Sequence, residues 1–129
     1  MEVLVLSNGK FTKKEINGEL EELQKIVGGY IEIPYLSKVF NENEIDIIIN
    51  EEGKFIDGLN KEIAVIDKET NKILDIVYGN CIFASHDEEG NTTGLSTEQM
   101  ETVLNELAME VMVTYKSANK HTVMKALFV

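Results

Sequence analysis

Apolar residues in the first part of the chain run together over short stretches or alternate with polar ones. Residues 3–6 are apolar on both faces of an extended segment, which predicts an opening strand in a central position of a sheet. Asn8-Gly9 follows, a pair typical of a two-residue hairpin turn. Residues 11–16 then predict a second strand that returns beside the first, with its charged residues toward water.

A helical spacing follows these strands. The apolar residues that fall on one face of a helix are Leu20, Leu23, Ile26 and Val27. They predict a helix over about residues 18–27, with Asn17 as its N-cap. Gly28-Gly29 ends this helix, because glycine readily adopts the left-handed conformation that closes a C-terminus.

The stretch from residue 30 to residue 85 predicts strands separated by tight turns. Its strand-like segments are residues 30–35, 45–49 and 73–84, and its turn-like segments are 50–53 and 57–58. Residues 63–66 are either a short strand or the start of a helix, because periodicity does not separate the two over so short a run. No helix-length segment separates these strands, which favours antiparallel hairpins over parallel crossovers.

A second helix begins after Ser96, which has capping-box spacing to Gln99 in the first turn. The apolar residues that keep helical spacing behind them are Met100, Val103, Leu104, Leu107, Ala108, Val111, Met112 and Tyr115. This pattern predicts a helix over residues 97–115 that buries Leu104 and Leu107. Residues 117–129 end apolar, and three alternatives stay open for them: a longer helix, a last strand, or packing on a neighbouring molecule.

Together these elements predict an α+β fold in a single domain. A mainly antiparallel sheet of about five to seven short strands packs on two main helices, over about residues 18–27 and 97–115. The length of 129 residues suits one domain whose core needs neither a disulfide nor a metal ion.

Charge is distributed unevenly along the chain. The net charge is −11, all 12 basic residues are Lys, and Arg is absent. Residues 42–110 hold 17 acidic residues and four Lys, whereas residues 111–129 hold three Lys and no acid. Nucleic-acid binding is therefore disfavoured, since it relies on Lys and Arg placed against phosphates. The acidic middle either attracts basic proteins or only keeps the chain soluble.

Segments that would place the chain in or across a membrane are not evident. The apolar runs are far shorter than the roughly 20 residues of a transmembrane helix, and the N-terminus has the pattern of a first strand and not of a signal peptide. Cys81 is the only cysteine, so an internal disulfide is impossible. We expect a cytoplasmic protein without a membrane partner.

Candidate catalytic and metal-binding chemistry is sparse. His86 and His121 are the only histidines, and neither they nor Cys81 has the spacing of a zinc site. Cys81 is flanked by apolar residues, which favours a buried structural thiol over a nucleophile. His86, beside Asp87, is interpreted as part of a solvated loop. We expect no metal and no cofactor, and an enzyme is the least favoured class.

Three segments, in this order, resemble the family called domain of unknown function 3846. They are Leu23-Gln-Lys-Ile-Val-Gly-Gly-Tyr-Ile-Glu32, Asn50-Glu-Glu-Gly-Lys54 followed by Asp57-Gly-Leu-Asn-Lys61, and Ile73-Leu-Asp-Ile-Val-Tyr-Gly-Asn-Cys-Ile-Phe83. The opening strand and Leu95–Gln99 also fit, so the family-like core covers residues 1–107 and residues 108–129 extend the same domain. The family tends to run G-L-P-x-N-R, whereas Gly58-Leu59-Asn60-Lys61 lacks the proline and has Lys in place of Arg.

The resemblance implies a setting and no activity. Family members occur in bacteriophages and mobile elements of Gram-positive bacteria, which implies a small acidic accessory protein. Our leading hypothesis is a non-enzymatic binding protein that acts on a host or phage protein, one version being an anti-defence inhibitor that presents its acids as a DNA mimic. The alternative is a small-molecule binding or sequestering protein.

Candidate binding residues lie where the family likeness concentrates. They are Gly28, Gly29, Tyr30, Asn50, Glu51, Glu52, Gly58, Asn60 and Lys61. A homodimer through the C-terminal region is a further expectation, because residues 126–129 are apolar and need cover. That cover could equally come from the chain's own sheet.

Overall fold

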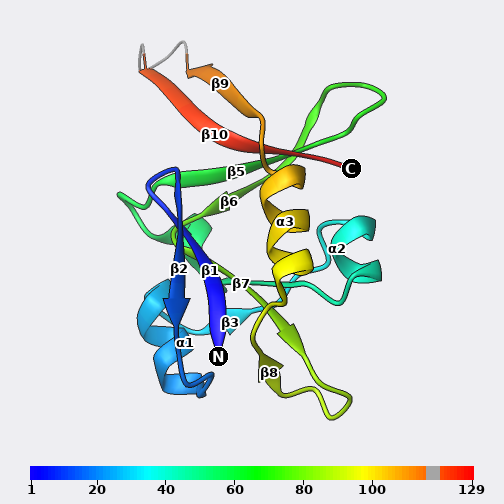
Figure 1. Cartoon of the computed structure of the whole chain (residues 1–129). Helices are drawn as coiled ribbons and strands as arrows, with labels where there is room; N and C mark the ends of the chain where they lie inside the picture. The colour runs from blue at the N-terminus through cyan, green and yellow to red at the C-terminus, as the bar shows by residue number, and fades with distance from the viewer. Residues whose placement is uncertain (116–119) are drawn as a thin grey trace.

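The computed structural model describes residues 1–115 and 120–129 and has an α+β architecture, as predicted (Figure 1). The strands in the described residues are β1 Glu2–Ser7, β2 Lys10–Glu15, β3 Ile31–Glu32, β4 Asp46–Asn50, β5 Lys61–Ile66, β6 Ile73–Tyr78, β7 Cys81–His86, β8 Thr92–Thr93, β9 Glu110–Tyr115 and β10 Lys120–Phe128. The helices are α1 Leu20–Val27, α2 Lys38–Glu42 and α3 Thr97–Glu106, with one 3-10 turn, η1 Gly53–Phe55.

The strands form two sheets in place of the one that was expected, and they number more than five to seven. The first sheet has the order β2-β1-β7-β4-β3, with β8 beside β7, and its pairs are antiparallel. The second has the order β6-β5-β10-β9, in which β10 runs parallel to β5 and antiparallel to β9. The prediction of a mainly antiparallel arrangement is therefore confirmed.

The opening strand is central, as its doubly apolar pattern predicted. β1 lies between β2 and β7, and its side chains enter two different cores. Leu4 and Leu6 join the main core, to which α3 and both sheets contribute. Val3 and Val5 join a second core beneath α1. Two buried faces explain why this strand is a continuous apolar run and not an alternating one.

Helix α1 forms close to the predicted boundaries, although its N-cap is Glu19 and not Asn17. Asn17 instead supports the turn that leads into the helix. Its Oδ1 accepts the Glu19 N–H at 2.8 Å, and its own N–H donates to a Glu22 carboxylate oxygen at 2.9 Å. Gly28, at φ +84°, ends the helix in the left-handed conformation.

Helix α3 begins as predicted but is much shorter than residues 97–115. The capping box is present, because the Ser96 hydroxyl accepts the Gln99 N–H and the Gln99 side chain accepts the Ser96 N–H. The helix ends at Glu106, and the chain re-enters the second sheet at Glu110. The apolar residues that continued the helical spacing, such as Val111, belong to β9, where β-branched side chains are favoured.

The prediction that Leu104 is buried is wrong, whereas Leu107 is buried as expected. Leu107 is 1% exposed and belongs to the main core, but Leu104 is 42% exposed. With only ten residues in α3, the buried face is narrow and is set by Met100, Val103 and Leu107. Leu104 projects beside that face, into solvent.

The last-strand alternative holds for the described part of residues 117–129. β10 pairs with β5 on one side and β9 on the other, and Ala126 and Leu127 are fully buried. The chain's own second sheet therefore covers most of the apolar end. Residues 116–119, which the sequence left open in part, lie outside the described residues.

Leu104 of α3 and Leu107, the C-cap residue that follows it, provide a test of the packing. Leu107→Ala should lower the free energy of unfolding by about 2–5 kcal/mol, because it opens a cavity in the main core. Leu104→Ala should lower it by about 1 kcal/mol or less, since that side chain is largely solvated. Urea denaturation of both variants checks this, and equal losses would contradict the assigned helix face.

Candidate functional site

The Gly28-Gly29 turn and Asn50 come together at the C-terminal end of α1. The N–H groups of Gly28 and Gly29 both donate to the Gln24 carbonyl, at 2.8 and 3.1 Å. The buried Asn50 side chain donates from Nδ2 to the Val27 carbonyl at 3.2 Å. These bonds satisfy helix carbonyls that otherwise lack partners. Three of the predicted binding positions, Gly28, Gly29 and Asn50, thus anchor the helix end.

Gly29 is required here by space. A Cβ at this position would lie 2.9 Å from Asn50 Nδ2, which is buried and hydrogen bonded. Asn80, in the turn between β6 and β7, makes a second bond of the same kind, from its Nδ2 to the Ile26 carbonyl at 3.0 Å. Sequence reasoning did not assign this role to Asn80, because a Gly-Asn turn gives no sign of the helix end that it reaches.

Tyr30, Glu51 and Glu52 are the exposed members of the same cluster. β3 pairs with β4, and the Glu51 N–H donates to the Tyr30 carbonyl at 2.8 Å. Asn50 Oδ1 accepts the Glu52 N–H at 2.8 Å. The Asn50 amide therefore holds the helix end with its nitrogen and the following turn with its oxygen. The three exposed side chains stand on a backbone that is fixed from both sides.

Large apolar side chains of three segments face solvent, and the first of these segments begins at Tyr30 of this cluster. The exposed ones in the segments 30–35, 55–56 and 73–74 are Tyr30, Ile33, Tyr35, Phe55, Ile56, Ile73 and Leu74. Phe55 is 86% exposed, the highest fraction among the exposed large apolar residues. We call these seven residues the aromatic surface. Three segments that the sequence separates thus contribute to one apolar region.

A cavity of about 130 Å³ lies between the first two segments and β6, and Phe55 is the member of the aromatic surface that lines it. Its wall includes Pro34 from the first segment, Phe55 from η1, and Tyr78 from β6. A neighbouring hollow, which shares Pro34 with this cavity, is lined by Ile33 and Tyr35. A shallower hollow beside the cavity is lined by Ile73, Leu74 and Tyr78. Glu32 and Glu51 also line the cavity, so the border of this apolar region carries negative charge.

The η1 turn is held against β6 by two contacts. A Cβ on the buried Gly53 would lie 3.0 Å from the Tyr78 carbonyl oxygen, so only glycine allows this approach. The Lys54 ammonium forms an ion pair with Asp75. Phe55 is consequently presented by a turn that is fixed on its inner side.

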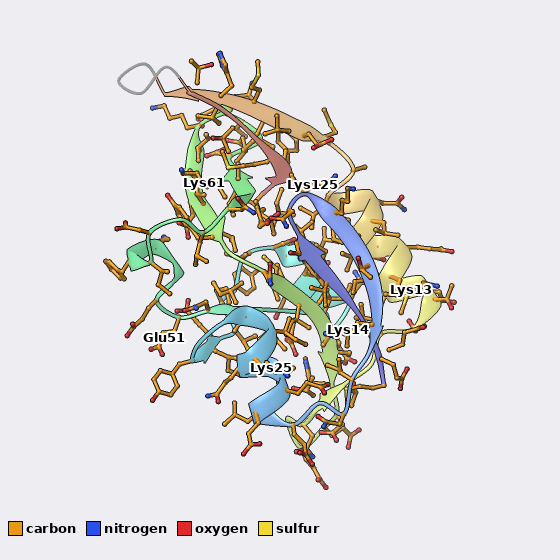
Figure 2. All side chains as sticks on the ribbon, turned by 90° about the vertical axis from the view of Figure 1, so that its left-hand side faces the viewer. Lys13, Lys14, Lys25, Glu51, Lys61 and Lys125 are labelled. Atoms are coloured by element: carbon orange, nitrogen blue, oxygen red, sulfur yellow. The ribbon has the colours of Figure 1, made fainter. Side chains whose placement is uncertain are left out.

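Asn60 and Lys61 occupy a different place, near the tip of the first hairpin. Figure 2 shows Lys61 and Glu51 at separate places on the same side of the molecule. Asn60 and Lys61 line a hollow of about 440 Å³ together with Asn8, and we call it the hairpin hollow. The Asn60 amide contacts the Asn8 side chain. Gly58 is an exposed turn residue with φ +86°. The structure thus divides the predicted site residues into two groups.

The Lys61 side chain connects the two groups. Its ammonium lies 5.6 Å from the centre of the Tyr78 ring, within cation–π range. Tyr78 lines the cavity of the aromatic surface, so Lys61 stands between that cavity and the hairpin hollow.

Glu62 is an anchor that sequence reasoning missed. It is 2% exposed, and its carboxylate accepts the N–H groups of Asn8 and Gly9 at 2.7 and 2.9 Å. The pairing of β5 with β6 shifts register between Lys61 and Ile63, which marks a bulge at Glu62. A bulge redirects the side chain of its extra residue. Here it lets a residue of the second sheet hold the hairpin turn of the first.

Cys81 is buried, as its apolar neighbours predicted. Burial, and secondarily the negative charge of Glu62, raise the pKa of the Cys81 thiol far above its ordinary value. The thiol stays protonated near neutral pH, which makes it a poor nucleophile.

His86 belongs to β7 and not to a solvated loop, which corrects the sequence interpretation. Its Nδ1 lies 2.8 Å from an Asp46 carboxylate oxygen. In the part of the chain that the structure describes, no group of three or more His, Cys, Asp or Glu residues could hold a metal ion. Over the same residues, no helix has the length and apolar character needed to cross a membrane.

Comparison with known sequences identifies one family. The family described as Domain of unknown function (DUF3846) matches the chain over residues 1–108. The match ends in the loop after α3, so β9 and β10 lie beyond it. No curated protein and no solved structure matches the chain significantly.

The contact between Gly29 and Asn50 can be tested by a double-mutant cycle. Asn50→Ala should lower the free energy of unfolding by about 1–3 kcal/mol, because it leaves a helix carbonyl unsatisfied. Gly29→Ala should be more destabilising in the wild-type background than in the Asn50→Ala background, where the clash is gone. Phe55→Ala, the exposed control, should change stability by less than about 0.5 kcal/mol. Additive losses at positions 29 and 50 would contradict the close contact.

The pair of His86 and Asp46 predicts a pH dependence. The hydrogen bond to Asp46, and then its charge, raise the pKa of His86 above its ordinary value of 6.5. Because the pKa of His86 is raised in the folded state, the protonated ring stabilises the fold. This contribution to the free energy of unfolding is complete below about pH 6.5 and is lost as the pH rises through the raised pKa. NMR titration should show the raised pKa, and Asp46→Asn should return it toward 6.5. An unchanged His86 pKa in that variant would refute the assignment.

Proposed function

We propose that this chain, which belongs to the DUF3846 family, is a non-enzymatic binding protein whose aromatic surface docks onto another protein. The observation that carries the proposal is that exposed Tyr, Phe and aliphatic side chains line three adjoining hollows: Ile33 and Tyr35 line one, Phe55 the next, and Ile73 and Leu74 the third. Soluble proteins rarely leave such side chains clustered in solvent without a binding role. Aromatic residues are also enriched where protein interfaces gain most of their binding energy.

The fixed backbone beneath the aromatic surface supports the same proposal. Asn50 anchors the helix end before Tyr30 and the turn that follows β4, and Gly53 packs on the Tyr78 backbone beside Phe55. A surface held in place before binding loses little conformational entropy when a partner arrives. Asn50, a candidate binding residue that has a structural role, therefore contributes to binding indirectly, because it helps to position Tyr30 and η1 with Phe55.

Charge defines the kind of partner. Glu32 and Glu51 line the cavity beside Phe55, the exposed Glu52 follows Glu51 in the same turn, and the one lysine of η1 is paired with Asp75. An acidic border around an apolar centre fits a partner with basic residues around an apolar centre. This gives the excess of acids in residues 42–110 a role in attracting that partner.

The wider setting forms part of the same proposal. The protein acts in the bacterial cytoplasm as a phage- or mobile-element-encoded accessory protein, and its partner is a host or phage protein. Inhibition of a host defence nuclease is one version of it, since such nucleases present basic surfaces to DNA. The buried Cys81 thiol supports the non-enzymatic version, because its raised pKa keeps it protonated and makes it a poor nucleophile.

A second candidate function, binding of a small molecule, rests on the hairpin hollow. Its volume of about 440 Å³ is of the size that small ligands occupy. Asn60, Lys61 and Lys10 offer polar groups of both donor and acceptor type there. Native mass spectrometry of the protein purified from cells should show a retained mass that Lys61→Ala loses. A chain mass without any adduct would remove this candidate.

Affinity capture from bacterial lysate tests the leading proposal. The full chain should retain a specific protein, and the Tyr30→Ala/Phe55→Ala variant should lose it. A Leu20→Ala/Leu104→Ala variant, which removes two exposed apolar side chains elsewhere, should retain it. Retention should weaken as salt rises, because the acidic border contributes. Equal capture by the Tyr30→Ala/Phe55→Ala variant and the full chain, or no specific capture at any salt, would contradict the proposal.

A further inference from the structure

The described strands leave four sheet edges at the ends of the two sheets. They belong to β2 and β3 in the first sheet and to β6 and β9 in the second. An edge strand presents unpaired backbone N–H and C=O groups, and natural proteins protect such edges with lysine, proline, bulges or short length.

Three of these edges are protected. β2 carries Lys13 and Lys14, which Figure 2 shows along that strand, as well as Lys10. β3 is only two residues long and is soon followed by Pro34. β6 has an irregular register opposite Val65–Ile66, where a bulge interrupts its pairing. Each of these edges therefore resists pairing with another strand.

β9 lacks these protections. It forms the outer edge of the upper sheet in Figure 1, and its sequence Glu110-Val-Met-Val-Thr-Tyr115 contains no lysine and no proline. Its register with β10 is regular throughout. Met112, at its centre, is 64% exposed, and the other two apolar residues described there, Val111 and Val113, are half-buried. Such an edge is a template for a further strand.

We propose that a second copy of this chain pairs antiparallel with β9, so that two four-stranded sheets become one of eight strands. A twofold axis perpendicular to the sheet keeps each side chain on its own face, so a residue can pair only with itself or with one an even number of positions away. With the axis at Met112, Met112 meets Met112 of the second copy, Val111 meets Val113, and Glu110 meets Thr114. No like charges face each other.

The faces beside the edge favour a second copy over a different partner. On one face, Met112 lies next to the exposed Val123 of β10. On the other, Val111 and Val113 border a cluster around the buried Met124, and none of that cluster's members comes from a helix in the described chain. Both faces are apolar at the edge, so an identical strand is complementary to each of them.

This contact replaces the one expected from the apolar C-terminus. Ala126 and Leu127 are already buried within their own sheet and are not available to a second copy. The inference is independent of the proposed function, since Ile73 and Leu74 of the aromatic surface lie on β6, the opposite edge of the second sheet. A dimer through β9 would carry two free aromatic surfaces.

Sedimentation of the full chain at tens of micromolar provides the test. The wild-type protein should be a reversible dimer, whereas Met112→Lys and Met112→Glu should each be monomeric, because each places like charges opposite one another. An equimolar mixture of the two variants should dimerise again, since Lys and Glu then face each other across the axis. Circular dichroism should show both variants folded, because Met112 is exposed.

Val123→Lys is the matched control. It places a charge on the same face at similar exposure, but one strand away from the edge, and it should leave the dimer intact. A monomeric wild-type protein would overturn the inference. So would dimers that survive Met112→Lys, a mixture that stays monomeric, or equal dissociation by Val123→Lys.

Discussion

The open carbonyl groups at the C-terminal end of α1 are the constraint on which the candidate site depends. They are satisfied by two asparagine side chains from distant parts of the chain, Asn50 at the end of β4 and Asn80 before β7. Because the Asn50 amide also accepts a hydrogen bond from the Glu52 N–H, the helix end and the following turn become one unit. The helix positions the 30–36 segment, the turn positions η1, and the aromatic surface lies between them.

A second polar anchor joins the two sheets. The buried Glu62 carboxylate holds the tip of the first hairpin through two backbone N–H groups, and the bulge at its position directs it there. An unpaired carboxylate would be costly to bury, so these two bonds are required once the strand places Glu62 inside. The same turn needs Asn8 at φ +52° and Gly9 at φ +76°, which explains its Asn-Gly sequence.

Local patterns predicted the local structure well. The first hairpin, helix α1 with its Gly-Gly end, and the Ser96 capping box all follow from residues close together in the sequence. The error at residues 97–115 arose because Val111 continues a helical spacing by coincidence. β9 is a strand because it pairs with the next strand, β10, and β10 pairs in turn with β5, which lies far away in the chain. Glu62 and Asn80 gave no signal for the same reason, since their roles depend on groups that only the fold brings near. Tyr30 and Glu51 were chosen as candidate binding residues because the family likeness concentrates around them, and their role in binding stays a prediction.

The central claim is that the aromatic surface is the face that receives the partner. Hydrogen–deuterium exchange on the captured complex, compared with the free chain, tests it most directly. The account predicts added protection in residues 30–36 and 53–56 and on β6, with no change on β2 or α3. Added protection confined to β2 or α3, with the aromatic surface exchanging as in the free chain, would contradict it.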